Sequence, residues 1–273
     1  MSIITLSRSS CSQGRIIAEK VAEKLGFECL SREILLEAAE QFNVPHVKLD
    51  KALNDGPTLL ERFSHGKERY IPLIKAALLN RLSKGKIVYH GLAGHFLVQD
   101  VPQVLKIRIQ ADKDDRIAEK KSRENVSDAV ARALLAMEDR ERDSWSRHVC
   151  RMNPSDSELY DLVINLRGIS VDDCVTMICN TVALEKFKMT DKALKQIDDL
   201  AFAATIKATL VTKYDKAIVT SRSGKVFIKL PDAMSGVYKT KVEIESLLSD
   251  IPGINHLNFD IKSNTLPRTA MRK

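Results

Sequence analysis

The sequence predicts an α/β protein in which a parallel sheet carries helices on both faces and a smaller α+β domain follows. Four short apolar segments suit buried strands and are separated by helical patterns. They are residues 3–6, 86–90, 104–109 and 160–166. Strands that alternate with helices form parallel, doubly wound sheets. After Phe187 the order becomes helix, strand, strand, helix, strand, which indicates a second domain. We expect domains at 1–187 and 188–262 and a disordered basic tail at 263–273.

The composition narrows the classes of partner and the compartment. A net charge of +7 favours polyanionic partners, nucleotides among them. Aromatic residues make up only 5% of the chain, which argues against a base-stacking surface and so against nucleic acid. No segment has the apolar length of a membrane span, and the first strand leaves no room for a signal peptide. The cysteines form no C-x-x-C pair, so we expect a cytoplasmic protein with free thiols. They are Cys11, Cys29, Cys150, Cys174 and Cys179.

The first strand leads into a polar loop at 7–14 and then into a helix that begins near Arg15. Ile17, Val21 and Leu25 recur every fourth residue, and Gly26 ends the helix. The free N–H groups at a helix N-terminus attract anions, so strand, loop and helix together form a candidate phosphate cradle.

This loop is a degraded match to the phosphate-loop motif G-x-x-x-x-G-K-[ST]. Gly14 holds the second glycine position and Arg15 stands at the lysine, whereas Ser9 replaces the first glycine. Ile16 replaces the hydroxyl that normally ligates Mg²⁺, and we expect its side chain to pack under the sheet as that of Ile17 does. The pattern alone leaves a second interpretation open, an ordinary strand-to-helix turn with a surface arginine.

Helical patterns continue from Arg32 to Phe42 and, with breaks, from Val44 to Gly85. The strand at 86–90 then ends in a polar turn, His90 to His95. Ligands in open parallel sheets bind beyond the carboxyl ends of strands, so this turn is expected beside the phosphate cradle. We predict no metal site from the two histidines, because five residues is an awkward helical spacing and no third ligand is evident.

Basic helices follow the strand at 104–109. Arg116 lies in the first, and Arg140 and Arg142 lie in the second, within DRERDSW at 139–145. Such patterns usually mark solvated helix surfaces. Phosphoryl transfer, however, needs charge neutralisation, and a hinged pair of helices can bring guanidinium groups over a phosphate. Arginines two positions apart on a helix point in different directions, and we favour Arg142 over Arg140 for the phosphates.

In the second domain a helix at 191–212 precedes a hairpin formed by 217–221 and 225–230 around Ser223-Gly224. A helix at 240–248 and a strand at 254–261 complete it.

The opening SRSSCSQGRIIAEKVAEKLG resembles that of the cytidylate-kinase-like family, which typically reads SREYGSGGREIAEKLAEKLG. Further matches follow in order along the first 185 residues: GKIVYHGLAGHFLV, VLKIRIQADKDDRI, DRERDSW and YDLVINLRGIS. The resemblance implies a P-loop kinase-type fold and a nucleoside monophosphate kinase-like transferase. Its substrates would be ATP and a CMP or dCMP acceptor, with Mg²⁺ held through phosphates and water.

The resemblance also implies roles for individual residues. The ATP phosphates would lie in the loop Ser9, Ser10, Cys11, Ser12, Gln13, Gly14 and Arg15. Arg15 would bridge the β- and γ-phosphates, and the catalytic arginines Arg116, Arg140 and Arg142 would belong to a lid that neutralises the transferring phosphoryl group. The acceptor would contact Arg32, His90, Gly91 and His95, beneath a cover formed by 44–85.

Two further interpretations stay open. The missing hydroxyl at Ile16 and the missing glycines at Ser9, Cys11 and Gln13 favour a catalytically silent nucleotide sensor. The second domain resembles a BON domain, in its glycine turn and in the Pro-Gly-Ile before its last strand, which implies a small ligand or an acidic membrane surface as partner. The other alternative is an interaction protein that acts through this domain. The domain could also be a generic α+β dimerisation module, and the oligomeric state is left open.

Overall fold

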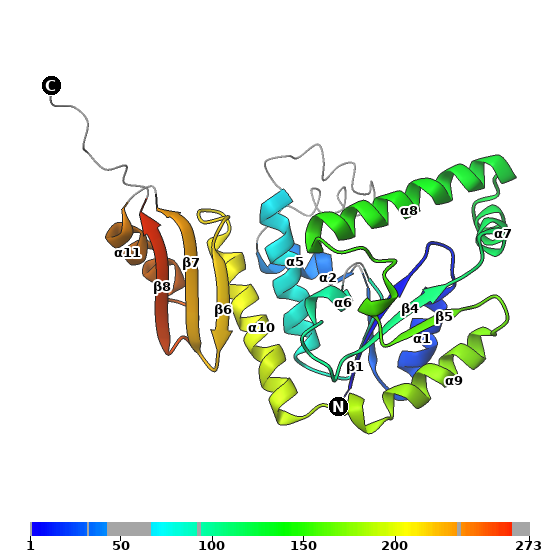
Figure 1. Ribbon diagram of the computed structural model, residues 1–273, viewed down its shortest axis with the longest axis horizontal. Coiled ribbons are helices and arrows are strands. Elements are labelled where there is room, and N and C mark those ends of the chain that lie inside the picture. Colours follow the sequence, from blue (N-terminus) through cyan, green and yellow to red (C-terminus); the bar gives the residue numbers. More distant parts are fainter. Residues whose placement is uncertain (1, 32, 43–66, 92–93, 234–235, 264–273) are drawn as a thin grey trace.

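The computed structural model describes residues 2–31, 33–42, 67–91, 94–233 and 236–263. Its larger sheet has five parallel strands in the order β2-β3-β1-β4-β5, which confirms the predicted α/β class (Figure 1). The strands are β1 (Ile3–Arg8), β2 (Glu28–Leu30), β3 (Ile87–Tyr89), β4 (Leu105–Gln110) and β5 (Leu162–Asn165). β1 is central, pairing with β3 on one side and β4 on the other, so the loop after β1 lies in the middle of the sheet's carboxyl edge.

Helices cover both faces of this sheet. On one face, α1 (Gly14–Leu25) and α9 (Val171–Val182) pack over Ile4, Leu6 and Ile107. On the other, α2 (Glu33–Gln41) and α5 (Lys67–Leu82) pack over Ile3 and Ile87. Successive β1 side chains enter opposite cores, as the alternation of a strand requires. The short helix α6 (Gly94–Leu97) lies close to β1.

Two further helices lie beyond the carboxyl ends of the strands, α7 (Lys113–Glu124) and α8 (Asp128–Cys150), here called the lid (Figure 1). The Oγ of Ser127 accepts a hydrogen bond from the N–H of Val130, which caps α8 where the chain turns back from α7. A short 3₁₀ segment (Ser157–Leu159) precedes β5.

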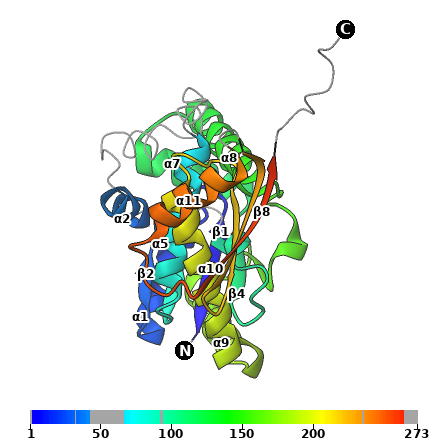
Figure 2. The ribbon, with the colours of Figure 1, turned by 90° about the vertical axis from the view of Figure 1, so that its left-hand side faces the viewer.

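The smaller domain is a mixed three-stranded sheet in the order β6-β7-β8, with two helices. After a 3₁₀ turn (Glu185–Phe187), its elements follow in the predicted order: α10 (Asp191–Leu210), β6 (Ile218–Arg222), β7 (Lys225–Ala233), α11 (Val237–Leu248) and β8 (His256–Ser263). β6 and β7 are antiparallel, and β7 and β8 are parallel. Figure 2 shows α10 and α11 on the same side of this sheet, where Ile206 and Ile244 are buried in a common core. The BON-like identity stays a prediction.

Helix α10 joins the two domains. Ala193, Ile197 and Ala204 pack into the core that α5 shares with the larger sheet, whereas Ile206 and Leu210 pack under the smaller one. The boundary at 187 stays a prediction, but the helix that follows it belongs to both cores.

One expectation about the loop is wrong. The side chain of Ile16 does not pack under the sheet: the residue is 46% exposed, whereas Ile17 is fully buried. Adjacent helical positions point about 100° apart, so only one of the two can face the sheet. The predicted acceptor residue Arg32 and residues 44–66 of the predicted cover at 44–85 lie outside the described residues. Among the helices that the structure describes, each is too short or too polar to cross a membrane.

Candidate active site

The loop between β1 and α1 adopts a conformation that favours glycine at two positions where glycine is absent. Cys11 and Gln13 both have a φ of 53°, in the left-handed region. The conformation costs an L-residue with a side chain about 1–2 kcal/mol. The Oγ–H of Ser12 donates to the carbonyl oxygen of Ser9 across 2.8 Å, and the N–H of Ser9 donates to Ile109. The loop is therefore held by its own hydrogen bonds and by β4.

Gly14, the first residue of α1, is required by its neighbour Arg8. A Cβ atom at position 14 would lie 2.7 Å from Cδ and 2.8 Å from Cβ of Arg8. These distances are shorter than van der Waals contact, so the arginine side chain lies directly across this turn. The glycine thus allows a guanidinium-bearing side chain to cross the start of the helix.

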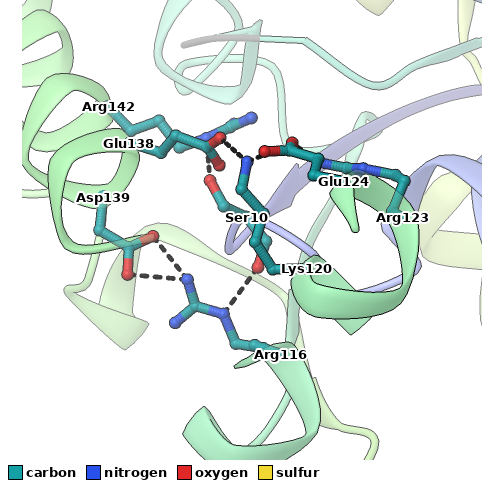
Figure 3. Close-up of polar contacts among 8 residues, drawn as sticks. All are labelled: Ser10, Arg116, Lys120, Arg123, Glu124, Glu138, Asp139 and Arg142. Carbon is teal, nitrogen blue, oxygen red and sulfur yellow. Dashed lines mark hydrogen bonds and ion pairs between the residues drawn. The ribbon is translucent and has the colours of Figure 1, made fainter. Parts of the chain in front are cut away.

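Both lid helices hold the same loop residue, Ser10 (Figure 3). Nε–H of Arg116, in α7, donates to the Ser10 carbonyl oxygen across 2.6 Å. Nε–H of Arg142, in α8, donates to Ser10 Oγ across 3.0 Å. Nη2 of Arg116 also donates to both carboxylate oxygens of Asp139, each across 2.7 Å, which ties the two helices together. The lid is therefore closed on the loop.

A buried lysine and a small apolar cluster complete the contact between lid and loop. Lys120 is only 2% exposed and pairs with Glu124 and Glu138. Burial lowers its pKa, but the hydrogen bonds that its ammonium donates to the two carboxylates outweigh burial, so the pKa is raised overall and the ammonium is retained. Beside it, Cys11 packs with three lid residues, Ile117, Ala131 and Leu135. Position 11 is a glycine in the family pattern that the sequence resembles. In this chain the Cys11 side chain packs against the lid helices.

A polar cavity of about 250 Å³ opens between the loop, the lid and the turn after β3. Its basic residues outnumber its acidic ones. Lining it are Ser7, Arg8, Ser9, Gly91, His95, Arg108, Arg116, Asp139, Arg142, Asp143, Ser146, Pro154 and Ser155. Guanidinium groups bind carboxylates and phosphates through paired N–H donors, so the cavity suits an anion.

Arg108 lies at this cavity and is 9% exposed. Its Nη1 is 3.4 Å from Ser7 Oγ and 3.5 Å from the hydroxyl of Tyr160. Its Nε–H has no hydrogen-bond partner among the described residues. A buried N–H without a hydrogen-bond acceptor is costly in free energy. An anion bound in the cavity would supply the missing acceptor. Sequence reasoning missed this residue, although an arginine within the apolar strand LKIRIQ was a usable signal.

Tyr160 links the same region to His95. Its hydroxyl donates to the carbonyl oxygen of Pro154 across 2.7 Å and lies 3.1 Å from Nε2 of His95. Burial, with the nearby charges of Arg108 and Lys106, lowers the pKa of His95 to about 3. The imidazole is therefore neutral near pH 7 and acts here as a hydrogen-bonding group.

Of the other residues predicted to contact the acceptor nucleotide, Gly91 lines the cavity and His90 does not. Gly91 lines the cavity, and a Cβ at this position would lie 2.1 Å from the Tyr89 hydroxyl oxygen, so a side chain has no room there. His90 is buried but does not line the cavity, and its Nδ1 has no partner among the described residues. Burial, followed by the charge of Arg8, lowers the pKa of His90 to about 4.

Only some of the residues predicted to contact the phosphates line the cavity. Arg116 and Arg142 lie at the cavity. Arg140 is exposed, and its Nε–H donates to the carbonyl oxygen of Ala136. Arg15 is exposed too, with its Nε 2.7 Å from Glu19 Oε1. Within the predicted loop, Ser10, Cys11 and Ser12 are buried and Gln13 is exposed. Groups of three or more residues able to hold a metal ion are absent from the described residues.

This combination defines a class: a P-loop kinase-like α/β domain, with the loop after the central strand facing a cavity under an arginine-bearing lid. Residues 3–167, more than half of the chain, match the family described as the cytidylate kinase-like family. The chain therefore belongs to that family.

Solved structures resemble the larger domain. An uncharacterized protein from Eubacterium ventriosum ATCC 27560 superposes with a TM-score of 0.52 at 19% identity, over 67% of this chain and 98% of that one. At this identity the likeness shows the fold alone. Weaker superpositions are found with a shikimate kinase from Bacteroides thetaiotaomicron (TM-score 0.43, 10% identity, 67% and 99% covered) and a gluconokinase from Sinorhizobium meliloti 1021 (TM-score 0.41, 11% identity, 66% and 95% covered).

Among curated proteins, a uronate isomerase from Corynebacterium glutamicum is 28% identical over 106 residues. The match covers 39% of this chain but spans only 20% of that protein's length.

Proposed function

We propose that the protein is a nucleoside monophosphate kinase-like phosphotransferase that moves the γ-phosphoryl group of ATP to a CMP- or dCMP-type acceptor. The observation that carries the proposal is the cavity at the carboxyl edge of the sheet, where Arg116 and Arg142 converge on Ser10 from the two lid helices. Catalysis of phosphoryl transfer is mainly positioning and charge neutralisation, and this arrangement supplies both.

In this proposal the loop from Ser9 to Arg15 holds the ATP phosphates. Arg116 and Arg142 exchange their contacts with Ser10 for the transferring phosphoryl group, and Arg8 and Arg108 bind the anionic end of the acceptor. Gly91 and His95 line the same cavity and contact the acceptor. Arg32 and His90 remain proposed acceptor residues, and Arg140 remains a proposed lid residue.

Arg15 is proposed to turn from Glu19 to the β- and γ-phosphates when ATP binds. An exposed ion pair between residues four apart on a helix contributes only about 0.3–0.5 kcal/mol, so its loss is a small cost. The apolar side chain of Ile16 offers no ligand for Mg²⁺, which in this proposal is held through phosphates and water. When bound, Mg²⁺ neutralises charge on the β- and γ-phosphates.

The second candidate is a catalytically silent nucleotide sensor. It is favoured by Cys11, which occupies a left-handed loop position and packs against the lid instead of leaving backbone open to phosphate. The smaller domain is proposed to be a BON-like regulatory or ligand-binding module at 188–262, and in a third candidate it is the functional part of an interaction protein. The four described cysteines are free thiols, which supports a cytoplasmic location.

A coupled ADP-release assay with ATP, Mg²⁺ and a panel of nucleoside monophosphates separates these candidates. The kinase proposal expects acceptor-dependent ADP release, with the highest rate for CMP or dCMP. Calorimetric ATP binding without release for any acceptor would favour the sensor. Absence of both would leave the interaction protein.

A further inference from the structure

A second, larger cavity of about 1140 Å³ lies between α5, α10 and the edge strand β6. Every residue from Ala217 to Ser223 lines it in unbroken succession. Successive side chains of a strand point to opposite faces, so a surface that includes all of them is the backbone edge. In the described part of the chain β6 has β7 as its one strand neighbour, and this edge is open toward the groove.

The hairpin turn fixes which backbone groups point into the groove. Ser223 and Gly224 have φ values of 50° and 78°, as in a two-residue type I′ turn. The flanking pair, Arg222 and Lys225, is then hydrogen-bonded, and pairing alternates along the strand. The N–H and C=O groups of Val219 and Ser221 therefore face away from β7, toward the open edge.

At the hairpin end of this β6 edge, Asp199 already accepts hydrogen bonds from the strand and the turn. Its Oδ1 accepts hydrogen bonds from the N–H of Ser223 across 2.6 Å and from the Oγ–H of Ser221 across 3.4 Å. It is the single acidic residue among those that line the groove. The remaining length of the edge, around Val219, is free to pair.

The groove is strongly basic. Its cationic lining residues are Lys75, Lys192, Lys195, Lys207 and Arg222. Lys207 donates to the carbonyl oxygens of Tyr214 and Asp215. Lys75, Lys192, Lys195 and Arg222 take part in no ion pair found among the described residues. Apolar contact area is also present, because Ile71 and Leu200 line the groove and Ile218 is 59% exposed.

We propose that this groove binds an acidic, extended polypeptide segment of a partner protein, which adds to β6 as a fourth strand. Main-chain hydrogen bonds to Val219 and Ser221 would supply affinity, and alternate carboxylates would meet the lysines of α5 and α10. A second copy of this chain is a poor occupant, because each copy carries a net charge of +7. The inference is independent of the proposed kinase activity.

The experiment uses the full chain and a fluorescein-labelled octapeptide that alternates glutamate with valine, measured by fluorescence anisotropy. A second peptide of identical sequence carries N-methyl groups on alternate backbone amides, which removes strand pairing and keeps every charge. We expect saturable binding of the first peptide with a Kd below about 1 mM, and binding of the second at least about tenfold weaker.

Two kinds of variant locate the site. Val219→Pro removes an edge N–H and is expected to weaken binding at least about fivefold, whereas the matched Val219→Ala keeps the N–H and binds as the wild type does. The double variant Lys192→Glu, Lys195→Glu is expected to weaken binding at least about tenfold. The control Lys239→Glu, Lys262→Glu makes the same charge change outside the groove and leaves binding unchanged. Near-UV circular dichroism of each variant checks folding.

The proposal is overturned if the octapeptide shows no saturable binding, or if the N-methylated peptide binds equally well. It is also overturned if inorganic phosphate or vesicles of acidic phospholipid displace the peptide while Val219→Pro has no effect, since the groove would then bind anions without strand pairing. A doubling of the mass on size-exclusion chromatography without peptide, abolished by Val219→Pro, would instead assign the groove to a second copy.

Discussion

Arg142 donates from its Nε–H to Oγ of Ser10 across 3.0 Å, which joins the second lid helix to the loop that follows the central strand. Arg140, two residues earlier, instead donates to the carbonyl oxygen of Ala136 in its own helix. We therefore expect Arg142→Ala to lower turnover at least about tenfold, equivalent to about 1.4 kcal/mol in the barrier, with little loss of ATP affinity.

Arg140→Ala is the matched control, because it removes an arginine of the same helix that does not line the cavity. Its turnover is expected to stay within about twofold of the wild type. Steady-state kinetics with calorimetric ATP binding gives both quantities. Full activity of Arg142→Ala together with loss of activity in Arg140→Ala would show that the lid acts through the other arginine.

Gly14→Ala tests the crossing of Arg8 over the start of α1. The added Cβ would lie 2.7–2.8 Å from Arg8 carbons, one of them Cβ, which cannot move away as freely as the end of the side chain. We expect a loss of about 1–3 kcal/mol in unfolding free energy, measured by urea denaturation. Gly168→Ala, where the added methyl meets nothing within 4 Å, should unfold as the wild type does. Equal stability of all three proteins would refute the close contact.

Ile16→Thr restores the hydroxyl that phosphate loops normally use for Mg²⁺. Because Ile16 is 46% exposed, the new hydroxyl is hydrated, and we expect a stability change of only a few tenths of a kcal/mol, about the helix-propensity difference. The fully buried Ile17 is the contrasting site, where threonine should cost about 1–3 kcal/mol. In a kinase, Ile16→Thr should raise turnover and tighten its Mg²⁺ dependence. A stable variant without Mg²⁺-linked ATP binding or phosphoryl transfer would favour the sensor.

The buried histidines predict acid destabilisation in a defined window. The folded-state pKa values of His95 and His90 are lowered from 6.5 to about 3 and about 4, so the unfolded chain binds these protons first. Their contribution to stability is complete above pH 6.5 and is lost as the pH falls toward 4 and 3. Each protonation contributes about 1.4 kcal/mol per pH unit, so His95→Gln should reduce the stability lost between pH 7 and pH 5 by about 2 kcal/mol. Urea denaturation at the two pH values measures it, and an unchanged difference would contradict the burial of His95.

The order of the elements could be predicted from the sequence because local patterns determine it. The strand around Ile4 and the helix that contains Ile17 and Val21 carry their periodicity in adjacent residues, and both were found at the expected place. Residues two apart on a helix point in different directions, and Arg142 lines the cavity whereas Arg140 does not. Such inferences need only local geometry, and the role of the lid stays a prediction.

Residues whose role depends on distant partners were missed. Arg108 lies at the cavity because β4 pairs with the central strand, and Tyr160 contacts it from the segment that precedes β5. Helix α10 has small apolar residues on two faces, and only the three-dimensional packing shows that one face meets α5. The exposure of Ile16 was misjudged because the direction of a side chain at a helix start depends on where the first turn begins.

The central claim is most directly tested by ³¹P NMR of the wild-type protein incubated with ATP, Mg²⁺ and CMP. The account predicts that the γ-phosphate signal of ATP declines while the two phosphate signals of CDP appear in equal amount, and that Arg142→Ala slows this transfer at least about tenfold. Persistence of ATP and CMP without CDP, in a protein that binds ATP by calorimetry, would contradict it.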